Sequence, residues 1–115
     1  MANDFKNAIA QNVSNAAGGT TLYTVPATKT SILLELDIAN TTQNVVEASV
    51  EVLDSSVSAS AWRYLVKNAP VPSGGSLMVI AGQKIVLEAG DKVRVTSSAA
   101  SVMDAVAAIL EDVNS

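Results

Sequence analysis

The chain has 115 residues, of which 49% are hydrophobic and only 16% charged, so it is long enough for one domain with a two-layer core and too apolar to be disordered. Cysteine and histidine are absent, which excludes disulfides and thiolate metal sites and removes the most common general base. Eleven acids outnumber seven scattered cations, which argues against nucleic-acid binding, and no apolar run approaches the roughly 20 residues of a membrane span.

The first 19 residues differ in pattern from the rest of the chain. Phe5, Ile9 and Val13 are spaced by four residues, as on one face of a helix. Residues 16–19, Ala-Ala-Gly-Gly, predict a flexible joint. We therefore expect residues 1–19 to form an N-terminal arm with this joint, and residues 20–115 to form the folded domain. The alternative is that the segment is the first strand of that domain.

From residue 20 onward the sequence predicts β-strands. Residues 20–25 are rich in β-branched and aromatic side chains and are followed by a proline. Residues 31–38 and residues 46–52 alternate between apolar and polar side chains, as half-buried strands do. The buried face expected for the first of these comprises Ile32, Leu34, Leu36 and Ile38. Since a polar turn of about five residues separates the two strands, we expect them to pair as an antiparallel hairpin.

The second half of the chain predicts further strands at residues 61–67, 76–80, 84–88 and 92–96. Residues 68–75 contain two prolines and two glycines and are expected to interrupt the strand ladder. Gly90 is placed to form the turn of a second hairpin, between residues 84–88 and 92–96. Residues 102–113 fit both a helical stripe and a strand face, and we expect a strand because the preceding strands leave edges to pair.

These seven or eight short strands, spaced by about ten residues, predict the fold class. We expect an all-β protein with a single antiparallel β-sandwich, of jelly-roll or Ig-like kind, preceded by the N-terminal arm. The N-terminus lacks the charged and apolar regions of a secretory signal peptide, so folding in a cytoplasm is expected.

The side chains that carry chemistry do not form a recognisable site. Four acids would gather if the two alternating strands paired, and clustered carboxylates are the ligands that calcium prefers. They are Glu35, Asp37, Glu47 and Glu51. No calcium-loop spacing is present, so a solvated outer face is expected, with no metal and no cofactor. The serines lack a histidine base, so no catalytic residue is expected either. Trp62 and Tyr64 suit stacking on a sugar ring, but a lone tryptophan in an all-β domain is more often a core or interface residue.

Several segments carry a family resemblance. They are residues 22–27 with 30–32, the strand end at residues 38–42, residues 64–72, residues 86–91, and residues 95–97 before an alanine-rich tail. This order resembles small virion structural proteins of tailed bacteriophages, including marine and cyanobacterial phages, over about residues 5–113. The resemblance implies a β-sandwich that attaches to other virion proteins, as decoration, neck and tail-accessory proteins do. It implies no catalytic residue.

We therefore expect a non-enzymatic structural protein of a tailed-phage virion, synthesised in the host cytoplasm, and acting as capsid decoration or cement or as another head or neck component. The expected partners are the major capsid, neck or tail proteins and further copies of the chain in a homo-oligomer, without nucleic acid or membrane. The residues expected to contact partners are Phe5, Ile9, Val13, Trp62 and Tyr64. The alternative function is a carbohydrate-binding β-sandwich module associated with a tail or fibre.

Overall fold

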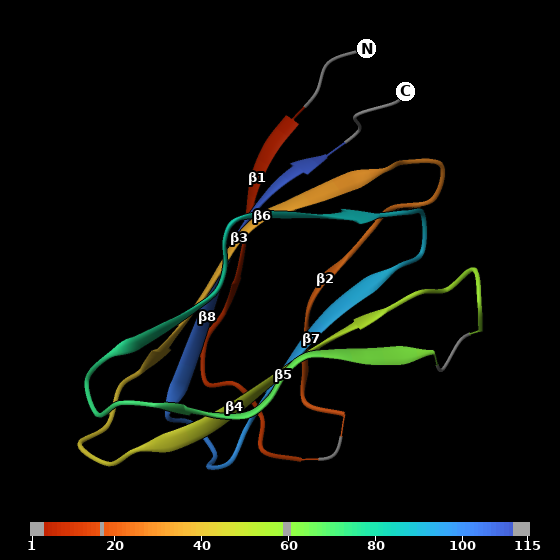
Figure 1. Cartoon of the computed structure of the whole chain (residues 1–115). Coiled ribbons are helices and arrows are strands. Elements are labelled where there is room, and N and C mark those ends of the chain that lie inside the picture. The colour runs from red at the N-terminus through yellow and green to blue at the C-terminus, as the bar shows by residue number, and fades with distance from the viewer. Residues whose placement is uncertain (1–3, 17, 59–60, 112–115) are drawn as a thin grey trace.

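The computed structural model describes residues 4–16, 18–58 and 61–111, which form two four-stranded antiparallel sheets packed as a sandwich (Figure 1). In spatial order, sheet A consists of β1 (Asp4–Ala10), β8 (Met103–Glu111), β3 (Ser31–Asn40) and β6 (Ser76–Leu87). Sheet B consists of β2 (Thr20–Thr24), β7 (Lys92–Ser97), β4 (Val46–Leu53) and β5 (Trp62–Val71). The expected all-β sandwich is confirmed, and the C-terminal segment is a strand. No helix in the described residues is long and apolar enough to span a membrane.

The strand order identifies the sandwich as a jelly roll. The chain passes from one sheet to the other at every connection except the one between β4 and β5. An eight-stranded double sheet with such crossings is the architecture found in viral capsid and lectin domains. Both predicted hairpins are therefore wrong, because β3 and β4 lie in different sheets, and so do β6 and β7. The polar turns were recognised correctly, but they are corners between the sheets.

The core lies between the sheets and is formed by alternate side chains of their strands. Its fully buried members include Leu36, Ile38, Val50, Val95 and Ile109. The predicted buried face of β3 is right at Leu36 and Ile38 and wrong at Ile32 and Leu34, which are only partly buried. The pairing register shifts between Leu33 and Glu35 on both sides of β3, and this β-bulge reverses the alternation, so that Leu33 faces the core.

Two strands are longer than the sequence predicts. β6 is continuous over residues 76–87 and joins the two predicted segments, with register shifts in its pairing to β3. β5 extends to Val71 through Pro70, where an interruption was expected. β5 is an edge strand that pairs only with β4, so its open side needs no donor from a proline.

The N-terminal segment is part of the sandwich, which corrects the expected division into an arm and a domain. β1 pairs with β8 along its whole length, from Asp4 opposite Glu111 to Ala10 opposite Ala105. Val13 is fully buried, and its N–H donates to the carbonyl of Met103 at 2.8 Å. The four-residue spacing of the apolar side chains also fits a strand, because residues 5 and 9 lie on one face of it. One domain therefore includes β1, and residues 1–3 and 17 lie outside the described part.

A hydrogen bond bridges the two ends of the expected flexible joint, in which Ala17 lies outside the described residues. Gly19 has a φ of 55°, and its N–H donates to the carbonyl of Ala16 at 2.9 Å. The Ser97 N–H donates to the carbonyl of Ser14 at 3.0 Å, which fixes the turn to the end of β7. The chain thus leaves sheet A and enters sheet B through a hydrogen-bonded corner.

Candidate functional site

The outer face of sheet A carries five of the eight large hydrophobic side chains that are exposed in the described residues. Cross-strand pairing arranges this face in rows. One row crosses β1, β8, β3 and β6 as Phe5, Leu110, Ile32 and Val86. A second row crosses the same strands as Ile9, Val106, Asp37 and Met78. Phe5 is 79% exposed and Ile9 69%. Such exposure of large apolar side chains is typical of surfaces that bind a partner or of the edge of a sheet.

The dimensions of this apolar face follow from sheet geometry. Four strands about 4.8 Å apart, each contributing about seven residues of roughly 3.4 Å, give an area on the order of 20 by 25 Å. The two apolar rows are separated by Asn7, Ala108 and Glu35. A group of exposed apolar side chains on one face commonly marks an interaction site. We call this surface the apolar face; its exposed members are Phe5, Ile9, Met78, Val86 and Val106.

The charges within the apolar face are mainly acidic. Glu35, Asp37 and Asp104 lie on it, and Lys84 lies near its β6 edge. Asp104 Oδ1 accepts a hydrogen bond from the Asn12 N–H at 3.0 Å. Asp37 Oδ1 is buried and has no hydrogen-bond partner among the described residues. The side chains of its cross-strand neighbours, Val106 and Met78, offer no donor to this oxygen.

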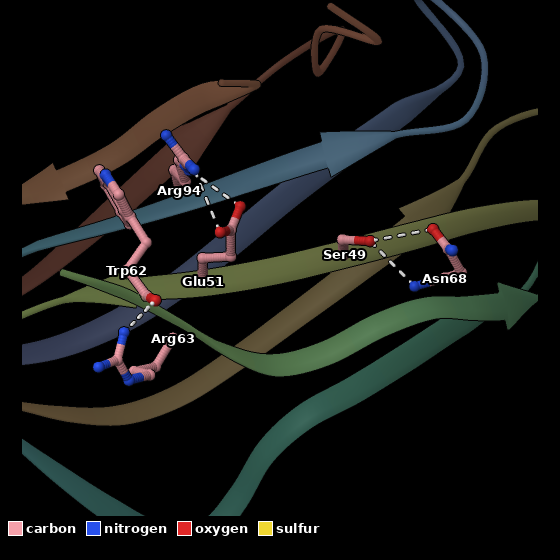
Figure 2. Close-up of polar contacts among 6 residues, drawn as sticks. All are labelled: Ser49, Glu51, Trp62, Arg63, Asn68 and Arg94. Carbon is pink, nitrogen blue, oxygen red and sulfur yellow. Dashed lines mark hydrogen bonds and ion pairs between the residues drawn. The ribbon is translucent and has the colours of Figure 1, made fainter. Parts of the chain in front are cut away.

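The outer face of sheet B is polar and held by side-chain pairs (Figure 2). The Arg94 guanidinium makes a two-point contact with Glu51, with Nε–Oε1 at 2.9 Å and Nη2–Oε2 at 3.1 Å. The same guanidinium lies over the Trp62 ring, 3.8 Å from its centroid. These contacts occupy one face of the indole and fix three neighbouring strands, β7, β4 and β5, in one arrangement.

The edge strand β5 presents an aromatic and cationic strip on its outer side, which we call the β5 strip and define as Trp62, Tyr64 and Lys67. Tyr64 is 52% exposed, and the Lys67 ammonium lies 5.2 Å from its ring centroid. Arg63 is exposed but lies on the other side of β5, opposite Val52, and its Nη1 donates to the Trp62 carbonyl at 2.9 Å (Figure 2). Ser49 on β4 accepts from the Asn68 N–H at 2.9 Å and so anchors the strand beyond Lys67 (Figure 2).

The residues predicted to contact partners fall into three places. Phe5 and Ile9 lie on the apolar face, and Trp62 and Tyr64 lie on the opposite side of the sandwich, in the β5 strip. Val13 is in the core, so its prediction as a contact residue is wrong. Met78, Val86 and Val106 were missed; their alternation with buried neighbours was the available signal, but it does not tell the inner from the outer face of a sheet.

The four acids of the possible calcium site do not gather. Glu35 and Asp37 lie in sheet A and Glu47 and Glu51 in sheet B, because β3 and β4 do not pair. The described residues bring together a different trio, whose carboxylate oxygens lie within 4.8 Å of one another: Asp54, Glu88 and Asp91.

This trio is part of a corner between loops. Asp91 Oδ1 accepts from the Ser55 N–H and hydroxyl, each at 2.9 Å, and Oδ2 accepts from the Glu88 N–H at 2.9 Å. Asp91 is 5% exposed, and its hydrogen bonds join the turn before β7 to the loop after β4. An open depression of about 550 Å³ lies beside it, lined partly by Lys29, Ser55 and Glu88. Asp91 therefore stabilises the corner between the two loops. The sequence does not predict this role, because residues 54 and 55 lie far from Asp91 in the chain.

A buried polar network joins the two sheets near the ends of β1 and β8. The Tyr23 hydroxyl of sheet B donates to Glu111 Oε2 of sheet A at 2.5 Å, and the Ser31 hydroxyl lies 2.8 Å from the tyrosine oxygen. Lys6 Nζ lies 2.9 Å from the other oxygen, Glu111 Oε1. The Glu111 side chain is 3% exposed, so its charge is stabilised by these partners rather than by water.

The network shifts two pKa values in opposite directions. Hydrogen bonds from Tyr23 and then from Lys6 lower the pKa of Glu111 below its usual range. Burial, followed by the hydrogen bond to Glu111, raises the pKa of Tyr23 to about 12. Ionised Glu111 therefore contributes stability that is present above about pH 4.3 and is lost as the pH falls through its lowered pKa. The neutral Tyr23 contributes stability that is complete below about pH 10 and is lost as the pH rises toward 12.

Replacing Tyr23 by phenylalanine should expose this alkaline dependence. We expect Y23F to lower the free energy of unfolding by about 1.5–3 kcal/mol at neutral pH. The reason is that the buried carboxylate of Glu111 loses the hydrogen bond that the Tyr23 hydroxyl donates. The difference from wild type should stay constant from about pH 6 to 9 and shrink between about pH 10 and 12. Urea denaturation followed by circular dichroism measures it. Y64F, at the exposed tyrosine, is the control and should change stability by less than about 0.5 kcal/mol. A pH-independent difference would contradict the assignment.

The fold and its surfaces define an eight-stranded jelly roll with one apolar outer face and one polar, ion-paired outer face. No protein-family model, no curated protein and no solved structure matches the chain.

Proposed function

We propose that this protein is a non-enzymatic structural component of a tailed-phage virion, which attaches to other virion proteins through the apolar face. The observation that carries the proposal is the exposure of five large hydrophobic side chains on one side of a regular sheet. Water-exposed apolar area of this extent is unfavourable for an isolated chain and becomes favourable when a partner covers it.

The scaffold and composition support the same role. A jelly roll is a rigid frame that recurs in viral capsid domains, which supports the proposal by analogy of fold. The chain has no histidine and no cysteine, so the side chains that most often act as bases and nucleophiles are missing. The strand and turn signatures that resemble phage virion proteins suggest decoration, cement or neck as the place of attachment.

The alternative, a carbohydrate-binding module, has weaker support. Stacking on a sugar requires an open aromatic face, but the guanidinium of Arg94 covers one face of Trp62. The acids expected to hold calcium beside it are divided between the two sheets. Tyr64 remains exposed, but it already contacts Lys67.

Mass spectrometry of gradient-purified particles tests the proposal. We expect peptides of this chain in the particle fraction at a ratio to the major capsid protein that stays constant across the particle peak, since a structural component has a fixed copy number. An abundant host cytoplasmic protein in the same lysate is the control and should be depleted from that peak. If the chain is present in infected cells but is removed from particles together with the control, the virion role is wrong.

A further inference from the structure

We propose that the open edge of β1 pairs antiparallel with β1 of a second copy, so that the two copies of sheet A join across a two-fold axis at Asn7. The surface is the edge of the strand Asp4–Ala10, and the partner is the same strand of another chain. This inference deepens the proposed assembly role by naming one partner, and it rests on that role only for its biological setting.

β1 is the edge strand that is best suited to take up a further strand. The described sheets end in β1 and β6 on one side of the sandwich and in β2 and β5 on the other. The pairing register shifts along β6, β2 and β5, and β5 also contains Pro70, which has no N–H to donate. Such irregularities protect an edge from pairing. β1 instead keeps one continuous register with β8 over all seven residues and contains no proline.

Lys6, the cation of β1, does not block this edge. A lysine on an edge strand commonly keeps other strands away. The Lys6 Nζ, however, lies 2.9 Å from Glu111 Oε1 on the neighbouring strand β8, so its charge is drawn back toward β8. The opposite side of β1 presents Phe5, Asn7 and Ile9, which are exposed and uncharged. Two copies of this strand can therefore approach without repulsion on that side.

The sequence of β1 is complementary to itself in one antiparallel register. Residues directly opposite each other in an antiparallel ladder point to the same face of the sheet. With Asn7 opposite Asn7 of the second copy, Phe5 lies opposite Ile9, and all seven residues of each strand are paired. A register centred on Lys6 would place two like charges opposite each other, which is destabilising. A register centred on Ala8 would leave Phe5 without an apolar partner.

Three kinds of contact stabilise the pairing centred on Asn7. The two strands form about six to eight backbone hydrogen bonds. The two pairs of Phe5 with Ile9 cover side chains that are 79% and 69% exposed in the single chain, and pairs of an aromatic with a β-branched residue stabilise sheets. The Asn7 amide both donates and accepts, so the two amides on the axis can bond to each other. The interface is small, so we expect a weak dimer.

The geometry of the pairing has a consequence for attachment. The two-fold axis of an antiparallel strand pair stands perpendicular to the sheet, so the apolar faces of both copies lie on the same side of one joined sheet. The dimer therefore presents two attachment surfaces together, and simultaneous binding through both strengthens attachment beyond that of a single copy. The contact uses the same strand on both copies, so association stops at two.

Sedimentation velocity of the purified full chain over a wide concentration range provides the test. We expect a monomer–dimer equilibrium without larger species. Phe5→Lys and Ile9→Glu should each weaken the dimer at least about tenfold, because each places a charge opposite an apolar side chain. An equimolar mixture of the two variants should associate more tightly than either alone. In the mixed dimer the introduced lysine faces the introduced glutamate, and the other pair of Phe5 with Ile9 is unchanged.

The matched control is Val86→Lys, which adds a charge to the apolar face at its opposite edge, on β6, and should dimerise like wild type. Circular dichroism and thermal unfolding of every variant establish that it is folded. A wild-type chain that stays monomeric at high micromolar concentration overturns the proposal, and so does a mass that grows beyond a dimer.

Two further outcomes would also contradict the pairing. A mixture of F5K and I9E that associates no more tightly than its components excludes the register centred on Asn7. A dimer that is lost in V86K but kept in the β1 variants indicates contact between apolar faces instead. Because purified chain is used, these results are independent of whether the protein occurs in particles, which the mass spectrometry of particles tests separately.

Discussion

A chain that begins at Ser14 is expected to lose at least about 4 kcal/mol of its free energy of unfolding, out of the roughly 5–15 kcal/mol typical of a domain. The truncation removes β1 and leaves one side of β8 without its hydrogen-bonded neighbour. It also deletes Val13, a fully buried core residue whose burial contributes about 1.5–3 kcal/mol. Finally, it removes Lys6 and leaves the buried charge of Glu111 with fewer partners.

Urea denaturation of the truncated chain measures this loss. The control begins at Asp4, keeps β1 whole and should unfold at nearly the wild-type midpoint. The sequence alone predicted that this segment belongs to an N-terminal arm outside the folded domain. A truncated chain that unfolds cooperatively with wild-type stability would restore that interpretation and would contradict the role of β1 as an integral strand.

Gly19→Ala is expected to destabilise the protein by about 3 kcal/mol or more. Gly19 has a φ of 55°, a conformation that costs other residues about 1–2 kcal/mol. In addition, a Cβ at this position would overlap with Thr96 Oγ1 and with the carbonyl oxygen of Val95. The backbone of β7 cannot move aside without disturbing its pairing to β2, so the overlap adds to the conformational cost.

Gly74→Ala is the matched control, because Gly74 has a similar φ of 64° but no atom within 4 Å of its added Cβ. It should cost only the conformational part, about 1–2 kcal/mol. Thermal or urea denaturation of both variants separates the two contributions. Equal destabilisation by both substitutions would show that the backbone at Gly19 shifts to avoid the overlap, so that the steric contribution is absent.

The sequence predicts the strands well because each strand is a local pattern. Alternation locates β4 and β7 within one or two residues, and the turn residues locate most of the corners. The partner of each strand is not a local property, so pairing by nearness in sequence failed for β3 with β4 and for β6 with β7. The bulge at Leu34 was also invisible, because a run of apolar residues fits either register.

The sequence predicts the exposed aromatic residues of the β5 strip but not the exposed valines of the apolar face. Trp62 and Tyr64 stand out as rare aromatic residues, and their strand is polar on its outer side, so their place in the β5 strip was foreseeable. Val86 and Val106 are of the same residue type as several core residues, so residue type alone does not show that they are exposed. Only the pairing of β8 between β1 and β3, and of β6 beside β3, reveals that they share one exposed face.

The position of the last two strands determines when the protein can acquire its structure during synthesis. β7 separates β2 from β4, and β8 separates β1 from β3, so each sheet lacks an inner strand until the final quarter of the chain has been made. β1 and β2 therefore stay unpaired until their partners β8 and β7 have been made, although β4 can pair with β5 and β3 with β6 before then. Folding that depends on contacts so distant in sequence is slow, and the exposed early strands are most vulnerable to aggregation in that interval.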